Sequence, residues 1–234
     1  GFNGPALRCV LAHPESFQNV DYRYHDVPAE RALKAVLLRW APEGLNHVAW
    51  ANSGTESWEK ALHMAMVKFP ERGTKCVCFK GSFHGRSLIS LFSSWNPKKR
   101  LPFQLEGYET LWAEFPEDTQ PHIEKEATPD WLALWELAAE PEFKSPSVDP
   151  EQDPLLAAEV ESLTQVLELC RDREVCAVSV EPMQCEGGDR FASKRFFQSL
   201  RVLTHALGVA LIFDEVQTGF GLGGAELWSN TFDL

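Results

Sequence analysis

An acidic residue stands at the end of an apolar stretch late in the sequence, where Leu211-Ile-Phe-Asp214 leads into a turn. A buried strand that delivers the Asp214 carboxylate to its end is stable only if a cation pairs with that charge. Ligands of open α/β sheets bind just outside the carboxyl ends of the strands. Asp214 could therefore pair with a protonated pyridine nitrogen, and Gln217 could hydrogen-bond a phenolic oxygen of the same ring. The alternative is an acid that caps the turn before Gly219.

A second candidate is Asn52-Ser-Gly-Thr-Glu56, which stands between an expected strand and an expected helix. Gly54 allows a close backbone approach, and the hydroxyls of Ser53 and Thr55 are free to donate. Unpaired amides at a helix start, together with the helix dipole, bind anions such as phosphate. The alternative is a helix cap, with Ser or Thr accepting a backbone amide and Glu56 nearby. Taken alone, the motif favours the cap.

A third candidate, Gly81-Ser-Phe-His-Gly-Arg86, also follows an expected strand directly. Phe83 could offer a flat face to an aromatic cofactor, and Arg86 could clamp a carboxylate through two hydrogen bonds. The alternative is a turn in which Phe83 packs in the core and Arg86 lies in solvent. We interpret His84 as structural rather than catalytic.

The stretch Val180-Glu-Pro-Met-Gln-Cys-Glu-Gly-Gly-Asp189 places two carboxylates and a glycine pair after another expected strand. The glycines let the backbone turn sharply. If Glu186 lies near a pocket, it needs an arginine partner or it binds a substrate cation. The alternative, a loop of exposed acids, suits Asp189 better than Glu186.

The composition is that of an ordinary globular chain of one domain or slightly more, with 234 residues, 44% hydrophobic and 24% charged. The net charge of −12 argues against a nucleic-acid partner. No apolar run is long enough to span a bilayer. The six cysteines form no C-x-x-C pair, which favours reduced thiols in a cytosolic-type compartment. The seven histidines are scattered, so no metal site is expected.

Apolar periodicity alternates between helical and strand-like along the chain. Strands are predicted at 47–51, 75–80, 175–180 and 209–213, and helices at 29–40, from 52–56 to Pro70, 129–139, 158–169 and 196–207. Residues after Trp95 are predicted to be irregular. The acid-rich stretch at about 114–161 is interpreted as an insertion or surface excursion. The pattern predicts an α/β fold with a largely parallel sheet and ligands at the strand ends.

Taken together and in this order, the motifs resemble those of the class-III aminotransferases, which are pyridoxal-phosphate-dependent enzymes of fold type I. The match extends from Gly1-Phe-Asn-Gly-Pro5 to Gly224 and is strongest at N-S-G-T-E, F-H-G-R, E-P-M-Q-C-E-G-G-D and D-E-V-Q-T-G-F-G. Each motif is weak alone, but four in order at plausible separations are specific. The resemblance implies the large domain of that fold, a mostly parallel sheet flanked by helices, in incomplete form.

The resemblance also implies how pyridoxal 5'-phosphate would be held. The cofactor contacts fall to Ser53, Gly54 and Thr55 at the phosphate, Phe83 stacked on the ring, Val216 beneath the ring, and Gln217 at the phenolic oxygen. Asp214 matches the partner of the pyridinium nitrogen, whose proton makes the ring an electron sink.

Two further residues match substrate-sorting positions of the family. Arg86 matches an arginine that holds a substrate carboxylate in several members. Glu186 matches a glutamate that pairs with a C-terminal arginine and frees it when a dicarboxylate binds. With Asp214, these two residues form the expected catalytic set.

Part of the family pattern has no match in this sequence. The Schiff-base lysine lies about thirty residues past the aspartate in the family, and none of the ten lysines here corresponds to it. The small domain with its substrate arginine is also missing. We therefore expect residues 1–234 to be an incomplete large domain that is inactive alone.

The implied reaction is transamination between an ω-amino acid and 2-oxoglutarate, because Glu-Gly-Gly-Asp189 resembles the branch acting on 4-aminobutyrate or the terminal amine of lysine. A homodimer is expected, because active sites of this family lie at a dimer interface. The phosphate loop lacks cysteine, so no iron–sulfur cluster is expected. The alternatives are an aminomutase or decarboxylase with the same cofactor, or a non-catalytic binding protein. The expected compartment is the cytoplasm, or the mitochondrial matrix if a transit peptide preceded Gly1.

Overall fold

The computed structural model describes residues 28–103 and 107–234, and its contacts divide the chain into two units, residues 1–49 and 50–234. The described part of the first unit contains helix α2, Pro28–Trp40, which confirms the helix predicted at 29–40. Lys34 and Glu30 form an ion pair one turn apart on it, at 2.6 Å. The motif Gly1-Phe-Asn-Gly-Pro5 lies outside the described residues.

The strand predicted at 47–51 is wrong. These residues have no regular secondary structure, and their side chains are half-buried or exposed. A strand is defined by hydrogen bonds to a neighbouring strand. An apolar run alone cannot guarantee that such a neighbour exists.

A parallel sheet organises residues 50–234. Within the described residues it has four strands in the order β2-β1-β3-β6, and every pairing is parallel. The strands are β1 (Lys75–Phe79), β2 (Thr110–Ala113), β3 (Val175–Val180) and β6 (Ala210–Phe213). Three of them confirm the predicted strands. Sequence analysis missed β2 because its four residues lie in a stretch interpreted as irregular.

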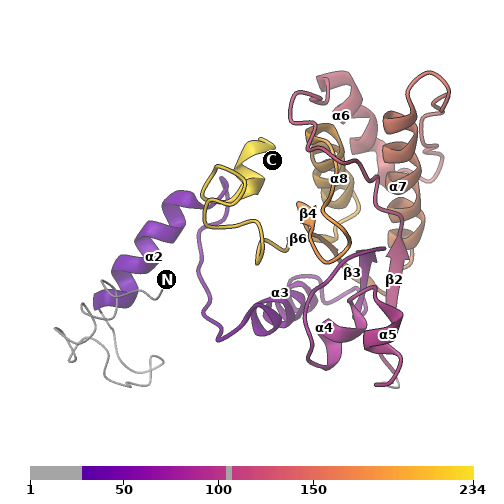
Figure 1. The fold of residues 1–234 in the computed structure, drawn as a ribbon. Helices are drawn as coiled ribbons and strands as arrows, with labels where there is room; N and C mark the ends of the chain where they lie inside the picture. Colours follow the sequence, from indigo (N-terminus) through magenta and orange to yellow (C-terminus); the bar gives the residue numbers. More distant parts are fainter. Residues whose placement is uncertain (1–27, 104–106) are drawn as a thin grey trace. The chain divides into compact units, whose positions relative to one another are not determined.

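Helices cover both faces of the sheet (Figure 1). One face packs against α6 (Pro129–Glu136), α7 (Pro154–Arg171) and α8 (Lys194–Ala206). The other packs against α3 (Gly54–Lys68), whose buried residues are Trp58, Leu62 and Ala65. Helix α7 begins four residues before its predicted start, because Asp153 caps it by accepting the amide of Leu156 at 2.9 Å. The arrangement confirms the predicted α/β class.

The acid-rich stretch contributes to the core as well as to the surface. Trp135 of α6 is fully buried, and Trp131 donates its indole N–H to Ser199 of α8 at 2.8 Å. The first amides of α8 donate to this stretch, Lys194 to the carbonyl of His122 and Arg195 to that of Lys125. Interpreting the stretch as a surface excursion was therefore incomplete, because one side of it is packed. That it is an insertion relative to the family stays a prediction.

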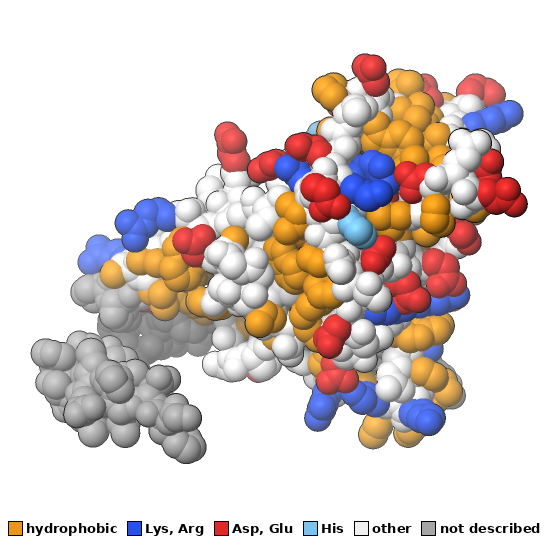
Figure 2. Space-filling view, turned by 45° about the horizontal axis from the view of Figure 1, so that its top comes forward, with side chains coloured by type: hydrophobic (Ala, Val, Ile, Leu, Met, Phe, Trp, Pro, Cys, Tyr) orange, Lys and Arg blue, Asp and Glu red, His pale blue; other side chains and the backbone are white. Residues whose placement is uncertain are grey.

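Shorter elements complete the described chain. They are α4 (Leu88–Phe92), α5 (Pro97–Arg100), the 3-10 helices η2 (Leu137–Ala139) and η3 (Trp228–Thr231), and an antiparallel pair β4 (Met183–Gln184) and β5 (Arg190–Phe191). Figure 2 shows acidic side chains spread over the face that it presents, with apolar ones between them. Across 28–103 and 107–234, the helices are too short or too polar to cross a membrane. The five cysteines of these ranges are unpaired.

An arginine side chain hydrogen-bonds to backbone carbonyls at the amino-terminal edge of the sheet. The guanidinium of Arg72 donates to the carbonyls of Cys170, Val175 and Leu207, at 3.0, 3.1 and 2.5 Å. Two of these carbonyls lie at the carboxyl ends of α7 and α8, where helix carbonyls lack intrahelical partners and the dipole favours a cation. Arg72 thus ties both helices to the start of β3.

We expect Arg72→Met to lower the free energy of unfolding by about 2–3 kcal/mol, because hydrogen bonds from a charged donor are lost and carbonyls are left unpaired. Urea denaturation measures this change. Arg173→Met is the matched control, since Arg173 is exposed at the same edge, and we expect a change within about 0.5 kcal/mol there. Equal destabilisation by Arg72→Met and Arg173→Met would show that the hydrogen bonds of the Arg72 side chain do not stabilise the fold.

Candidate functional site

Three of the predicted loops meet at the carboxyl edge of the sheet. A Cβ built on Gly54 would lie 2.8 Å from a methyl group of Val216, so the start of α3 rests against the loop after β6. The hydroxyl of Thr55 accepts the backbone amide of Arg86 at 3.3 Å. A Cβ on Gly85 would lie 2.2 Å from that same hydroxyl. Glycine at 54 and 85 is what allows these loops to approach so closely.

The start of α3 combines a cap with donor capacity. Ser53 is the N-cap residue, and its hydroxyl accepts the amide of Glu56 at 3.3 Å. Glu56 in turn accepts the amide of Asn52 at 2.9 Å. The predicted alternative of a cap is therefore confirmed, but a hydroxyl that accepts one hydrogen bond still has its own proton to donate. The first amides of a helix have no intrahelical acceptor, so this end remains able to bind an anion.

Asp214 lies directly after β6, and its side chain is 6% exposed. One carboxylate oxygen is 2.7 Å from Nδ1 of the buried His84, and the other accepts the amide of Val216 at 3.2 Å. Burial alone would lower the pKa of His84, but the hydrogen bond to Asp214 and the charges of Asp214 and Glu181 raise it above its ordinary value. The hydrogen bond from His84 thus offsets part of the cost of burying the Asp214 carboxylate.

A second buried acid, Glu181, lies at the end of β3. Its carboxylate accepts the backbone amide of Phe83 at 2.8 Å, which fixes the loop after β1 to the end of the neighbouring strand. Burial raises the pKa of Glu181 to about 8, although the charge of His84 and the Phe83 amide oppose the shift. Glu181, His84 and Asp214 therefore form one charge-coupled group below the surface.

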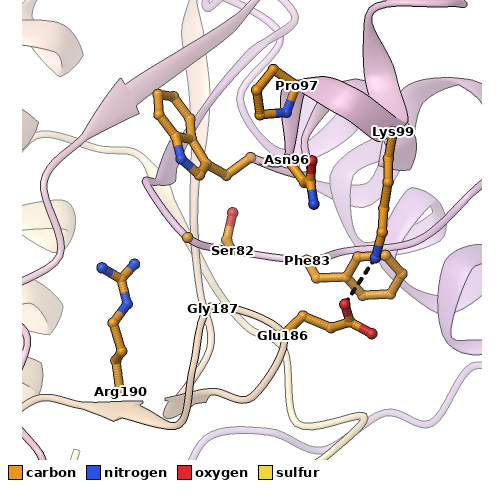
Figure 3. Close-up of a pocket in the computed structure, with 10 residues that line it drawn as sticks. Ser82, Phe83, Asn96, Pro97, Lys99, Glu186, Gly187 and Arg190 are labelled. Atoms are coloured by element: carbon orange, nitrogen blue, oxygen red, sulfur yellow. Dashed lines mark hydrogen bonds and ion pairs between the residues drawn. The ribbon is translucent and has the colours of Figure 1, made fainter.

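Phe83 and Glu186 border a cavity of about 320 Å³ (Figure 3). Lys99 of α5 points into it and forms an ion pair with Glu186 at 2.8 Å. The ammonium of Lys99 lies 5.1 Å from the centre of the Phe83 ring, and the exposed guanidinium of Arg86 lies 5.9 Å from it. The hydrogen bond and charge of Lys99 lower the pKa of Glu186. The cavity therefore presents an ion pair beside an aromatic face.

Arg190 lies on the opposite side of the same cavity (Figure 3). Its guanidinium donates to the carbonyl of Lys80 and to the side-chain oxygen of Gln184, and it forms an ion pair with Glu117. Gly81 has a φ of 91°, and a Cβ there would overlap the guanidinium. Glycine is thus required at position 81, and Arg190 holds the loop that carries Phe83.

The structure places the remaining predicted residues at this edge but at its surface. Val216 is 62% exposed, and Gln217 is exposed next to it. A cofactor with an anionic group and a cationic aromatic ring would find amides at the start of α3, the Phe83 ring, and the buried Asp214 carboxylate. In ranges 28–103 and 107–234, His, Cys, Asp and Glu side chains form no group of three that could hold a metal.

Three residues contact the predicted site without having been predicted to do so. Lys99 belongs to a basic run, Lys98 to Arg100, that matches no motif. Glu181 was recognised only as an acid at a strand end, and His84 was interpreted as structural although it contacts Asp214. The partners of these residues lie about a hundred positions away, so local spacing carried no signal for them.

Comparisons with known proteins agree on one family. The sequence model described as aminotransferase class-III matches residues 1–233. A LysW-aminoadipate semialdehyde/glutamate semialdehyde transaminase from Sulfolobus acidocaldarius is 31% identical over 202 residues, 86% of this chain and 39% of the relative. The 4-aminobutyrate aminotransferase of Saccharomyces cerevisiae is 29% identical over 245 residues, 99% of this chain and 50% of the relative.

The fold matches solved structures over the same extent. Lysine aminotransferase from M. tuberculosis superimposes with a TM-score of 0.72 at 25% sequence identity, covering 100% of this chain and 51% of the other. The chain spans half or less of the length of the two curated relatives. The likeness therefore covers the sheet and the motif-bearing loops described above.

We expect Gly54→Ala to lower the free energy of unfolding by about 1 kcal/mol, because the new methyl group overlaps the exposed side chain of Val216, which must shift. Val216→Ala removes the overlapping methyl groups, so the double variant should recover most of the loss. Urea denaturation of the two single variants and the double variant gives the coupling energy between the positions. Strictly additive effects would show that the two loops do not touch.

A pH dependence follows from Glu181. Its pKa is about 8 in the folded chain and near the ordinary 4.5 when unfolded, so only the folded state holds a proton between these values. The stability that this proton confers is full below the unfolded pKa and is lost as pH rises through about 8. We expect Glu181→Gln to flatten this decline in urea denaturations at about pH 5 and about pH 8.5. Glu136→Gln, on the exposed face of α6, should leave the decline unchanged.

Proposed function

Because the chain belongs to the class-III aminotransferase family, we propose that it forms the cofactor-binding part of a pyridoxal-phosphate-dependent aminotransferase. The observation that carries the proposal is the buried Asp214 carboxylate, held by His84 at the end of β6. Asp214 follows β6 at the carboxyl edge of the sheet, where ligands of open α/β sheets bind, and an acid there can hold a proton on a bound pyridine ring. The start of α3, which can bind a phosphate, rests against the neighbouring Val216.

Bound pyridoxal phosphate supplies an electron sink for the carbanion formed at the amino substrate. The Asp214 carboxylate holds a proton on the ring nitrogen, which keeps that sink effective. Ser53, Gly54 and Thr55 bind the phosphate through amides and hydroxyls. Phe83 and Val216 would contact the ring, and Gln217 would donate to its phenolic oxygen. His84 holds the Asp214 carboxylate in place.

For the substrates, we propose an ω-amino acid as donor, either 4-aminobutyrate or the terminal amine of lysine, and 2-oxoglutarate as acceptor. Arg86 binds a substrate carboxylate beside Phe83. Glu186, paired with Lys99, sorts the two substrates by releasing or retaining positive charge in the cavity. The 4-aminobutyrate aminotransferase and lysine aminotransferase among the similar proteins favour this donor class.

The complete enzyme is proposed to be a cytoplasmic or mitochondrial homodimer. The lysine that carries the cofactor, and the arginine that exchanges partners with Glu186, are proposed to lie in the part of the relatives that this chain does not span. Sequencing the source gene past the codon of Leu234 tests this. A lysine codon in frame within about thirty residues of Asp214 is expected, and a stop codon before it would contradict the proposal.

Two alternatives remain distinguishable by simple measurements. An aminomutase or decarboxylase with the same cofactor would form product without an oxo-acid acceptor, whereas an aminotransferase needs one. A non-catalytic binding protein would bind pyridoxal phosphate tightly and produce no transamination with any donor in the complete protein. Asp214 beside the phosphate-binding start of α3 is common to all three, so the acceptor dependence decides between the enzymes.

We expect Asp214→Asn to weaken the binding of pyridoxal phosphate to this chain by about tenfold or more, because the amide cannot neutralise a ring cation. Equilibrium dialysis with absorbance detection measures this affinity without any reaction. In the complete protein, the same variant should lower transamination by about 10²–10³-fold. Asp130→Asn, an exposed change in the first turn of α6, is the control. Unchanged binding and near-normal turnover in Asp214→Asn would overturn the assignment.

A further inference from the structure

A tryptophan lies flat against the imidazole that holds Asp214. The rings of Trp58 and His84 have centroids 5.1 Å apart and planes inclined by only 14°. Trp58 lies in the second turn of α3 and is 3% exposed, as is His84. The stack therefore joins the helix whose start approaches Val216 to the residue that contacts Asp214.

The indole is itself fixed at its polar end. Its Nε1–H donates to the hydroxyl of Ser179 at 2.8 Å, and Ser179 is fully buried within β3. A buried tryptophan satisfies its N–H in this way, which leaves one orientation for the ring. The backbone of Trp58 is thus fixed in α3, and its indole is fixed by the hydrogen bond to β3.

His84 is held in few ways by comparison. Its Nδ1 bonds to Asp214, while in the described part of the chain its Nε2 is buried and has no hydrogen-bond partner. The titratable groups that face the imidazole are Asp214, Glu181 and Cys76. With Nε2 unbonded, the Asp214 bond and the stacked indole are two contacts that orient the buried ring.

We propose that Trp58, anchored by Ser179, is a positioning residue for Asp214, because it keeps the His84 imidazole in the plane from which Nδ1 bonds the carboxylate. The inference depends on the proposed function in one respect only, namely that Asp214 is the residue that binds the cofactor ring. The stack itself acts on the protein with or without cofactor. A tryptophan that served only to fill the core would affect stability but not the His84 bond.

The test follows the Nδ1–H of His84 directly. In the 234-residue chain, proton NMR detects a downfield imidazole N–H signal, which is assigned by its absence in His84→Asn. We expect Trp58→Leu to make the exchange of this proton with water about tenfold faster or more, because the ring is free to leave the Asp214 bond. Trp58→Phe keeps a flat face but loses the N–H that Ser179 accepts, so it should restore only part of the protection. Ser179→Ala removes only the anchor and should give an intermediate rate.

Trp135→Phe is the matched control. Trp135 is fully buried in the other core cluster, against Phe143 and Trp131, so it should lower stability and leave the His84 signal unchanged. Protection in Trp58→Leu equal to wild type would overturn the proposal. So would an equal loss in Trp135→Phe, or no effect of Ser179→Ala. If Trp58→Leu does not fold, the comparison of Trp58→Phe, Ser179→Ala and Trp135→Phe decides.

The same set of proteins separates this inference from the proposed function. A His84 signal that depends on Trp58, together with pyridoxal phosphate binding that is indifferent to Asp214→Asn, supports the positioning role and overturns the cofactor assignment. Pyridoxal phosphate binding that requires Asp214, together with a His84 signal that does not depend on Trp58, supports the cofactor assignment and overturns the positioning role.

Discussion

The buried pair of Asp214 and His84 is the interaction on which the site depends. Desolvating a carboxylate is unfavourable unless a partner compensates for it, and here the partner comes from a loop 130 positions away. The parallel sheet makes this possible, because β1 and β6 both deliver their carboxyl ends to one edge. The neighbouring acid Glu181 binds the same loop through the amide of Phe83. The contacts of Asp214 and Glu181 therefore fix the carboxyl ends of β1, β3 and β6 relative to one another.

Much of the fold could be predicted from the sequence because strong local signals mark it. The strands at 75–79, 175–180 and 210–213 are mostly apolar runs, and the helix cap at Ser53 is a short-range pattern. The four-residue β2 carried too weak a signal. The run at 47–51 had the right residues but no neighbouring strand, which is a non-local property. The acid-rich stretch was interpreted as a surface excursion for a related reason. Its sequence does not indicate that its tryptophans pack near α8.

The sequence indicated which residue types form the candidate site. It did not indicate which side chains contact one another there. Asp214, Gly54 and Phe83 lie at the edge where the motifs placed them, and Glu186 lines a cavity. What no spacing could reveal was that Lys99 neutralises Glu186 or that Trp58 stacks on His84. Such pairs join segments that only the folded chain brings together. Motifs identify chemistry, whereas the contacts that orient it come from the fold.

The docking of the acid-rich stretch onto α8 has a consequence for how the chain folds during synthesis. The hydrogen bonds of Ala127 to Gln198 and of Trp131 to Ser199 span 71 and 68 positions. Residues 127–135 therefore leave the ribosome well before the surface that covers them exists. Contacts with such large sequence separation form late, and exposed tryptophans are a hazard while they wait. The carboxylates around these tryptophans add like charge, which opposes association of such exposed apolar surface.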